Sequence, residues 1–195
     1  MDRLVDIAKE TIELKDNPLA QFRRENTYYP VIGQGNPQAE IMVVGEAPGE
    51  NEAKRGVPFC GAAGKVLDEL FVAINLSRED VYVTNLIKDR PPENRDPTPE
   101  EIEIYAPFLD RQITCITPRV VLTLGRFSSH YCMNRYGLAK SVEPISSLHA
   151  RVFETTIGGQ SVSLVPFFHP AVALYNGSKR GQLKEDIKIL SQFIS

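Results

Sequence analysis

The sequence predicts an α/β fold in which a largely parallel sheet is covered by helices on both faces. Four short apolar runs are typical of buried strands, and the segments between them carry apolar residues at helical spacing. The chain has 195 residues, of which 42% are hydrophobic and 24% charged, as in ordinary globular proteins. This length suffices for one domain over residues 1–195, with a core that needs no disulfides.

The predicted strands are the apolar runs at residues 41–44, 81–83, 120–124 and 162–168. An amphipathic helix is expected around residues 4–14, ahead of the first strand. The helix after the first strand is indicated by the apolar positions Val66, Leu67, Leu70, Phe71 and Ile74. The helix after the second strand is indicated by Ile102, Tyr105, Phe108, Leu109 and Ile113.

Two helix ends are marked in the sequence. Thr98 and Glu101 have the spacing of a capping box, and Pro99 stands at the first helical position, so a helix should begin there. At the other end of the chain, a last helix should dock one apolar face on the sheet through Leu183, Ile187, Leu190 and Ile194.

Charge and cysteine content exclude several classes. Twenty-two Lys and Arg against 25 Asp and Glu give a net charge of -3, so any nucleic-acid site is a local patch on an acidic protein. No apolar run is long enough for a membrane helix, and we expect no leader peptide. Cys60, Cys115 and Cys132 form no Cys-x-x-Cys pair, so the cysteines indicate neither disulfides nor a metal site, and a cytoplasmic location fits.

Parallel sheets bind ligands outside the carboxyl ends of their strands, so the segments after the strands are the candidate site. After the first strand, the Gly- and Pro-rich run 45–52 and the pair Pro58-Phe59 direct backbone N–H groups, carboxylates and an aromatic face into a crevice. The alternative is an acidic surface turn with Phe59 in the core.

The second strand ends in Thr84-Asn85. An Asn amide offers one donor and one acceptor side by side, which matches the imide edge of a pyrimidine. The cations Lys88, Arg90 and Arg95 follow in the next segment and are candidates to bind phosphate. The alternative is a turn residue followed by a solvated loop.

The fourth strand leads into His169-Pro170, where a neutral imidazole would donate to a developing oxyanion. Residues 171–175 and the cations Lys179 and Arg180 follow, as a small apolar wedge with phosphate contacts beyond it. The alternative is a structural histidine. Neither a Ser-His-Asp order nor a His-Glu-x-x-His motif is present, so acyl transfer and metal-dependent hydrolysis lack support.

Together these segments resemble the family 4 uracil-DNA glycosylases, from about Gly33 to the C-terminal helix. The resemblance rests on motif order, spacing and placement at strand ends: Gly45-Glu46-Ala47-Pro48-Gly49-Glu50-x-Glu52, Pro58-Phe59-x-Gly61, Thr84-Asn85, Lys88-x-Arg90-Pro91-Pro92-x-Asn94-Arg95-Asp96-Pro97, Leu124-Gly125-Arg126 and His169-Pro170-Ala171. It implies a three-layer α/β/α sandwich around a four-stranded, mostly parallel sheet. It also implies a DNA repair enzyme that flips uracil out of DNA and hydrolyses its N-glycosidic bond, releasing free uracil and leaving an abasic site.

The resemblance implies roles for individual residues. Phe59 stacks on the flipped base, Asn85 reads its Watson–Crick edge, and Glu52 lies beside C5, where it excludes the thymine methyl group. His169 stabilises the charge on uracil O2 with the help of main-chain N–H groups of the first motif. Since Ala47 stands in the pocket where uracil glycosylases outside this family have a water-activating Asp, the water would fall to Glu46 or Asn94. On the DNA side the expected contacts are Leu174 and Tyr175 in the gap left by the base, and Lys88, Arg95, Lys179 and Arg180 on phosphates.

One departure from the family concerns its iron–sulfur cluster. The resemblance places four cysteine ligands: two before the Gly-x-Gly-Asn-Pro segment, one at the position of Asp89 and one at that of Ala106, and none of the four is a cysteine here. We therefore expect a protein with no metal and no cofactor.

Two other interpretations remain open on sequence grounds. One is a glycosylase for another deaminated base, such as hypoxanthine or xanthine, and the other is a catalytically idle protein that binds uracil or damaged DNA. The partners expected are single- or double-stranded DNA containing uracil and the free base as product, with a monomer acting in a prokaryotic or viral setting, in the cytoplasm and associated with the nucleoid.

Overall fold

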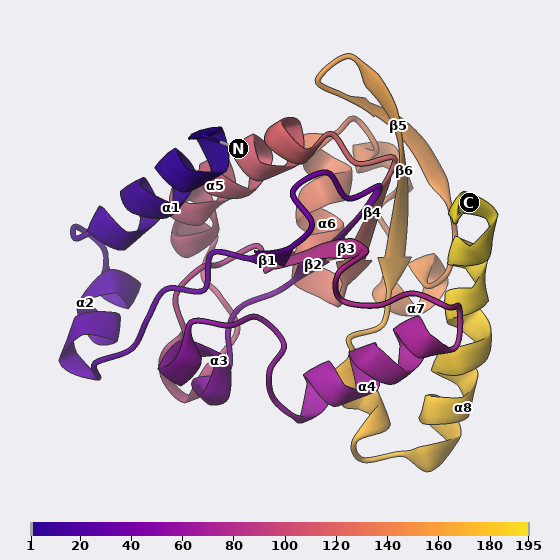
Figure 1. Ribbon diagram of the computed structural model, residues 1–195, viewed down its shortest axis with the longest axis horizontal. Helices are drawn as coiled ribbons and strands as arrows, with labels where there is room; N and C mark the ends of the chain where they lie inside the picture. The colour runs from indigo at the N-terminus through magenta and orange to yellow at the C-terminus, as the bar shows by residue number, and fades with distance from the viewer. Residues whose placement is uncertain (1, 195) are drawn as a thin grey trace.

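The computed structural model describes residues 2–194 and has an α/β architecture built on one sheet (Figure 1). The sheet has the strand order β1-β3-β2-β4-β6-β5. Its strands are β1 (Gln34–Gly35), β2 (Ile41–Gly45), β3 (Val81–Asn85), β4 (Val120–Leu124), β5 (Phe153–Ile157) and β6 (Gln160–Phe167). The four inner strands β3, β2, β4 and β6 run parallel, as expected, and both edge strands are antiparallel to their neighbours.

Helices cover both faces of this sheet. Their bounds are α1 (Asp2–Glu13), α2 (Pro18–Glu25), α3 (Glu50–Arg55), α4 (Ala62–Val72), α5 (Pro99–Ile116), α6 (Arg126–Arg135), α7 (Ile145–Leu148) and α8 (Gly177–Asp186). None of the helices within residues 2–194 combines the length and apolar character that crossing a membrane requires.

Successive side chains of a strand point to opposite faces of the sheet, so the core is divided into two layers. Met42 and Val44 of β2 face the cluster that includes α2, α5, α6 and α7, whereas Ile41 and Val43 face the cluster that includes α4 and α8. Figure 1 shows α1 and α5 on one side of the sheet and α4 and α8 on the other. The predicted three-layer α/β/α sandwich is confirmed.

The sheet has six strands where four were expected. Strand β5 pairs with β6 through a two-residue hairpin in which Gly158 and Gly159 have φ of 59° and 83°, the positive values that a type I′ turn requires. Its residues alternate between partly buried and exposed, so β5 is not an apolar run. Strand β1 has only two residues.

Some of the helix ends lie where the sequence predicted them and others do not. Thr98 Oγ1 accepts from the Glu101 amide and the Glu101 carboxylate accepts from the Thr98 amide, so the predicted capping box is confirmed. The C-terminal apolar stripe is divided between α8 and a 3₁₀ helix at Ile187–Phe193, where one helix was predicted. Helix α2, capped by Asn17, was not predicted.

Candidate active site

A cleft of about 650 Å³ opens at the carboxyl ends of the parallel strands. The segments that follow β2, β3 and β6 line it, as expected for this type of sheet. It brings together ten of the residues singled out in the sequence: Glu46, Ala47, Glu52, Phe59, Asn85, Asn94, Arg95, His169, Leu174 and Tyr175. Three others, Lys88, Lys179 and Arg180, do not line it.

Asn85 and Phe59 meet over Gly45 on one wall of the cleft. Gly45 and Asn85 are register partners at the ends of β2 and β3. A Cβ on Gly45 would lie 2.3 Å from Asn85 Oδ1 and 2.6 Å from Phe59 Cζ, so only glycine allows the amide and the ring to pack here. Among the described residues no hydrogen bond engages the Asn85 amide group, so its donor and acceptor are free for a ligand.

Phe59 has a left-handed backbone, with φ of 50°. This conformation is strained for an aromatic residue, so its surroundings must hold it. Arg78 donates to the Phe59 carbonyl at 2.8 Å and is itself paired with Asp68 at 2.5 Å. On the other side, a Cβ on Gly64 of α4 would lie 1.7 Å from the same carbonyl. The sequence offered no signal for the role of Arg78, because it follows the helix after Phe59 and lies 19 residues away.

His169 faces the same cleft as a neutral imidazole. Its Nδ1 accepts from the Ala171 amide at 3.2 Å, so in the neutral ring Nε2 carries the proton. Burial lowers the pKa of His169 to about 4, against the opposing effect of the Glu52 carboxylate. The ring stacks on Phe59, with centroids 5.7 Å apart and planes inclined by 29°. The arrangement provides a fixed, uncharged hydrogen-bond donor beside an aromatic face.

Glu46 and Asn94 differ in what their side chains are free to do. Burial raises the pKa of the Glu46 carboxyl to about 7, assisted by Asp96 and opposed by Arg126. Asn94 already accepts from Arg90 Nε at 2.8 Å through its side-chain oxygen. A proton acceptor that titrates near neutral pH is therefore present at Glu46.

Glu52 is held between two glycines. Its Oε1 accepts from the Gly61 amide at 2.9 Å, and a Cβ on Gly49 would lie 2.7 Å from Oε2. The carboxylate therefore has a fixed place in the cleft wall.

Lys88 is not at the surface, and its predicted contact with DNA phosphate is wrong. The residue is fully buried, and its Nζ donates to Thr84 Oγ1 at 2.8 Å, to the Asn85 carbonyl at 2.6 Å and to Gln112 Oε1 at 2.6 Å. Burial lowers the pKa of Lys88 to about 7, yet these three acceptors match the three protons of an ammonium group. Lys88 fixes the end of β3, and Gln112 on α5 is a partner that the sequence did not indicate.

The rim of the cleft carries exposed apolar and basic side chains. Leu174 is 41% and Tyr175 91% exposed. Lys179 donates a hydrogen bond to the uncharged side chain of Gln182. Arg180 forms an ion pair with Glu69, and Arg95 forms one with Glu101. Of the predicted phosphate ligands, Arg95 lines the cleft and Lys179 and Arg180 lie on α8, and both arginines already have an acidic partner.

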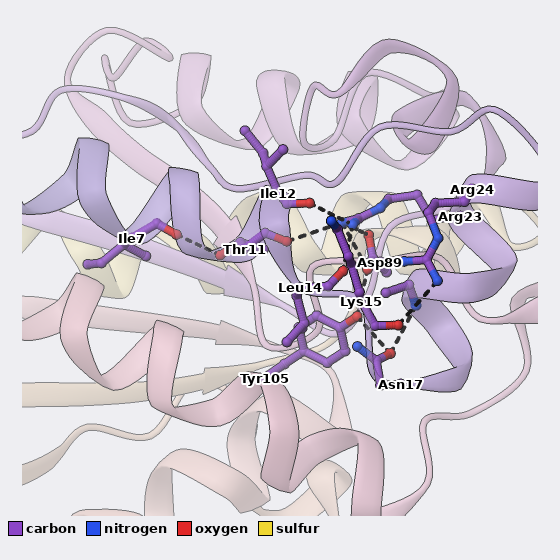
Figure 2. A network of polar contacts seen from close by, with 11 residues as sticks. Ile7, Thr11, Ile12, Leu14, Lys15, Asn17, Arg23, Arg24, Asp89 and Tyr105 are labelled. Carbon is purple, nitrogen blue, oxygen red and sulfur yellow. Dashed lines mark hydrogen bonds and ion pairs between the residues drawn. The ribbon is translucent and has the colours of Figure 1, made fainter.

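A buried polar network joins the N-terminal helices to the segment after β3 (Figure 2). Arg23 Nη1 lies 3.1 Å and 3.2 Å from the two carboxylate oxygens of Asp89, and the Tyr105 hydroxyl donates to Asp89 at 2.6 Å. Arg23 also donates to the carbonyls of Thr11 and Leu14 at 3.2 Å and 3.0 Å. Asp89 is thus engaged both by Arg23 of α2 and by Tyr105 of α5.

Comparisons with known proteins agree with the geometry. The family model of the uracil DNA glycosylase superfamily matches residues 32–191. The type-4 uracil-DNA glycosylase of Sulfurisphaera tokodaii is 44% identical over 96% of this chain and 83% of its own length. Its counterpart in Archaeoglobus fulgidus is 41% identical over 98% and 94% of the two chains, and that of Saccharolobus solfataricus is 43% identical over 100% and 88%.

These comparisons contradict the expectation of a protein without a cofactor. The relatives at 41–44% identity are type-4 enzymes, and the resemblance to this group implies an iron–sulfur cluster. Three cysteines are present: Cys60 before α4, Cys115 on α5 and Cys132 buried on α6.

The side chains do not fit such a cluster. Within residues 2–194 no three His, Cys, Asp or Glu side chains converge as a metal site. Asp89, at one position that the resemblance assigns to a cluster cysteine, already binds Arg23 and Tyr105. Among the described residues, the side chains therefore do not provide the ligands that the cluster of this family would need.

Proposed function

Since the chain belongs to the uracil-DNA glycosylase superfamily, we propose that it removes uracil from DNA by hydrolysing the N-glycosidic bond, releasing the free base and leaving an abasic site. The observation that carries the proposal is the position of neutral His169 beside Phe59, in the cleft that also contains Asn85. An aromatic ring, an amide and a neutral imidazole that line one cavity support this proposal.

Recognition begins with extrusion of the base, because the glycosidic bond is not accessible inside the stack. Phe59 packs on the flipped ring, and the Asn85 amide accepts from N3–H and donates to O4. Cytosine has an amine in place of O4 and mismatches this amide. The fixed Glu52 carboxylate lies beside C5 and excludes the methyl group of thymine.

Catalysis depends on the charge that leaves with the base. When the C1′–N1 bond breaks, its electron pair goes to uracil, and the sugar gains oxocarbenium character. The His169 Nε2–H donates to the anionic O2, and because Nδ1 is occupied by the Ala171 amide the donor is already oriented. Main-chain N–H groups of the loop after β2 add to this stabilisation.

Water then attacks C1′, and its proton needs an acceptor. Glu46 takes this proton, because its carboxyl lies in the cleft and titrates near neutral pH. Asn94 helps to hold this water through the hydrogen-bonding positions of its amide that the bond from Arg90 leaves free, and that bond orients the amide. Ala47 leaves space for the water between the loop after β2 and the base.

On the DNA side, exposed Leu174 and Tyr175 fill the gap left by the flipped nucleotide. Arg95, Lys179 and Arg180 hold phosphates, with Arg180 exchanging its Glu69 partner for DNA. Action as a monomer in the cytoplasm, near the nucleoid, stays a prediction.

The test is incubation of the purified protein with labelled single-stranded and duplex oligonucleotides that each contain one uracil, followed by alkali. Strand breaks that disappear in His169→Ala but persist in His130→Ala, a histidine on α6 that does not line the cleft, support the proposal. Binding without strand breaks in the unaltered protein would instead indicate a pocket that recognises uracil and does not excise it.

A further inference from the structure

A second histidine, His149, lies directly behind the chain segment that carries His169. It follows α7, and its side chain is 7% exposed. Its ring packs against Phe167 and Phe168, with centroid distances of 4.4 Å and 4.1 Å. The comparisons and the sequence motifs gave this residue no role.

Both ring nitrogens of His149 are engaged. Nδ1 accepts from the Phe168 amide at 3.0 Å, and Nε2 lies 2.9 Å from Oδ2 of Asp186 on α8. A backbone amide only donates and a carboxylate only accepts, so these two bonds require the neutral ring with its proton on Nε2. Burial lowers the pKa of His149 although Asp186 opposes this effect, which agrees with a neutral ring.

The bond from Phe168 matters because of where the strand ends. Strand β6 ends at Phe167, whose carbonyl accepts from the Gly125 amide at 2.8 Å, and the chain then turns through Phe168 into His169. The Phe168 amide points away from the ladder and finds its acceptor in the His149 ring. Asp186 in turn connects that ring to α8, so the turn that presents His169 is fixed to the helix layer.

We propose that His149, anchored by Asp186, is a positioning residue that sets the backbone from which His169 reaches the base. The inference rests on the proposed glycosylase function for its kinetic readout. A ring that only filled space at this place would be replaceable by another aromatic residue, and this difference makes the proposal testable.

Two substitutions separate the two possibilities. In His149→Asn the side-chain oxygen takes the place of Nδ1 and accepts from Phe168, whereas His149→Phe keeps the ring and removes both hydrogen bonds. We expect His149→Phe to reduce the single-turnover excision rate by roughly 10- to 100-fold with DNA affinity unchanged, because a small misplacement of a catalytic group is costly. His149→Asn keeps the bond from Phe168 but loses the bond to Asp186, so its rate should lie between those of His149→Phe and the unaltered protein. Equal rates for His149→Phe and the unaltered protein would overturn the proposal.

Asp186 provides a parallel pair should the ring variants fail to fold. Asp186→Asn keeps an acceptor for Nε2–H, and Asp186→Leu removes it, so only the second should slow excision. Equal rates for the two variants would contradict the role of the anchor.

Imidazole ¹⁵N NMR tests the proposal without any activity. His149 should show the Nε2–H tautomer, and the His169 signals should shift in His149→Phe but much less in His149→Asn. An Nδ1–H tautomer, or His169 signals indifferent to both changes, would overturn the positioning role. If the unaltered protein released no uracil, the proposed function would fail while this measurement still decided the role of His149.

Discussion

The imidazole of His169 stacks on the ring of Phe59, so the group proposed to stabilise the leaving base lies against the group proposed to hold it. We expect His169→Ala to lower the single-turnover rate by about 100- to 1,000-fold, the usual effect of removing one oxyanion donor. Affinity for DNA containing uracil should change little, because Phe59 and Asn85 remain. Quench-flow excision and fluorescence anisotropy measure the two quantities. A loss of binding equal to the loss of rate would mean that His169 holds the substrate and does not act on its charge.

The excision rate should depend on the ionisation of Glu46. With a pKa of about 7, this carboxyl is mostly protonated in acid and cannot accept the proton of the attacking water, so the rate should rise with pH and level off above about pH 7. His169, with a pKa of about 4, stays neutral throughout this range. In Glu46→Gln the rate should be roughly 100-fold lower and the rise should vanish. The same pH profile in Glu46→Gln and the unaltered protein would assign the rise to another group.

Lys88→Met should act on base recognition and stability rather than on phosphate binding. Loss of the ammonium leaves the Asn85 carbonyl and Gln112 without a buried donor, at a cost of about 1–3 kcal/mol for each unsatisfied group. Preference for uracil over cytosine should fall, whereas the slope of log affinity against log salt should not change. Lys179→Met is the matched control, since removal of a phosphate contact lowers that slope by about 1. A reduced slope in Lys88→Met would show that Lys88 does contact DNA phosphate.

Removing the Glu52 carboxylate should admit thymine. Glu52→Ala opens the wall beside C5, and exclusion of one methyl group typically accounts for about 10- to 200-fold in selectivity. Glu52→Gln keeps the acceptor for the Gly61 amide and the bulk of the side chain, so it should still reject thymine. Relative release of the two bases from matched duplexes measures the effect. Unchanged selectivity in Glu52→Ala would place the thymine filter elsewhere.

The buried Arg23–Asp89 pair should be costly to break from one side. Asp89→Ala leaves the Arg23 guanidinium buried and unpaired, and such changes typically cost about 3–5 kcal/mol in unfolding free energy. The double variant Arg23→Met with Asp89→Ala should be less destabilised than the sum of the single changes Arg23→Met and Asp89→Ala. Chemical denaturation of the four proteins gives the coupling energy. Strict additivity would show that the two side chains do not stabilise each other.

Much of the fold was predictable because the inner strands are uniformly buried and therefore read as continuous apolar runs. Strand β5 was not, since Phe153 to Ile157 alternates in burial and only the pair Gly158-Gly159 marked the hairpin. Helix α2 escaped prediction because it is short and polar on much of its surface, although Asn17 and Pro18 are a cap and a first-turn proline.

The site was predictable where the backbone path alone brings residues to one edge of the sheet, as for Asn85 and His169. It was not predictable where a side chain turns inward. Lys88 is two residues beyond Leu86 in a loop of charged residues, and nothing local indicates that Thr84 and Gln112 will draw its ammonium into the core. Such partners are set by tertiary packing, which a single sequence does not display.

The 1.7 Å that would separate a Cβ on Gly64 from the Phe59 carbonyl limits how this pocket can be redesigned. Any side chain at position 64 would push α4 away from the loop, so the aromatic wall cannot be moved by repacking the helix behind it. A change of base specificity therefore has to come from side chains such as Phe59 and Asn85, because the backbone contact between α4 and the loop leaves no room for a larger residue at position 64.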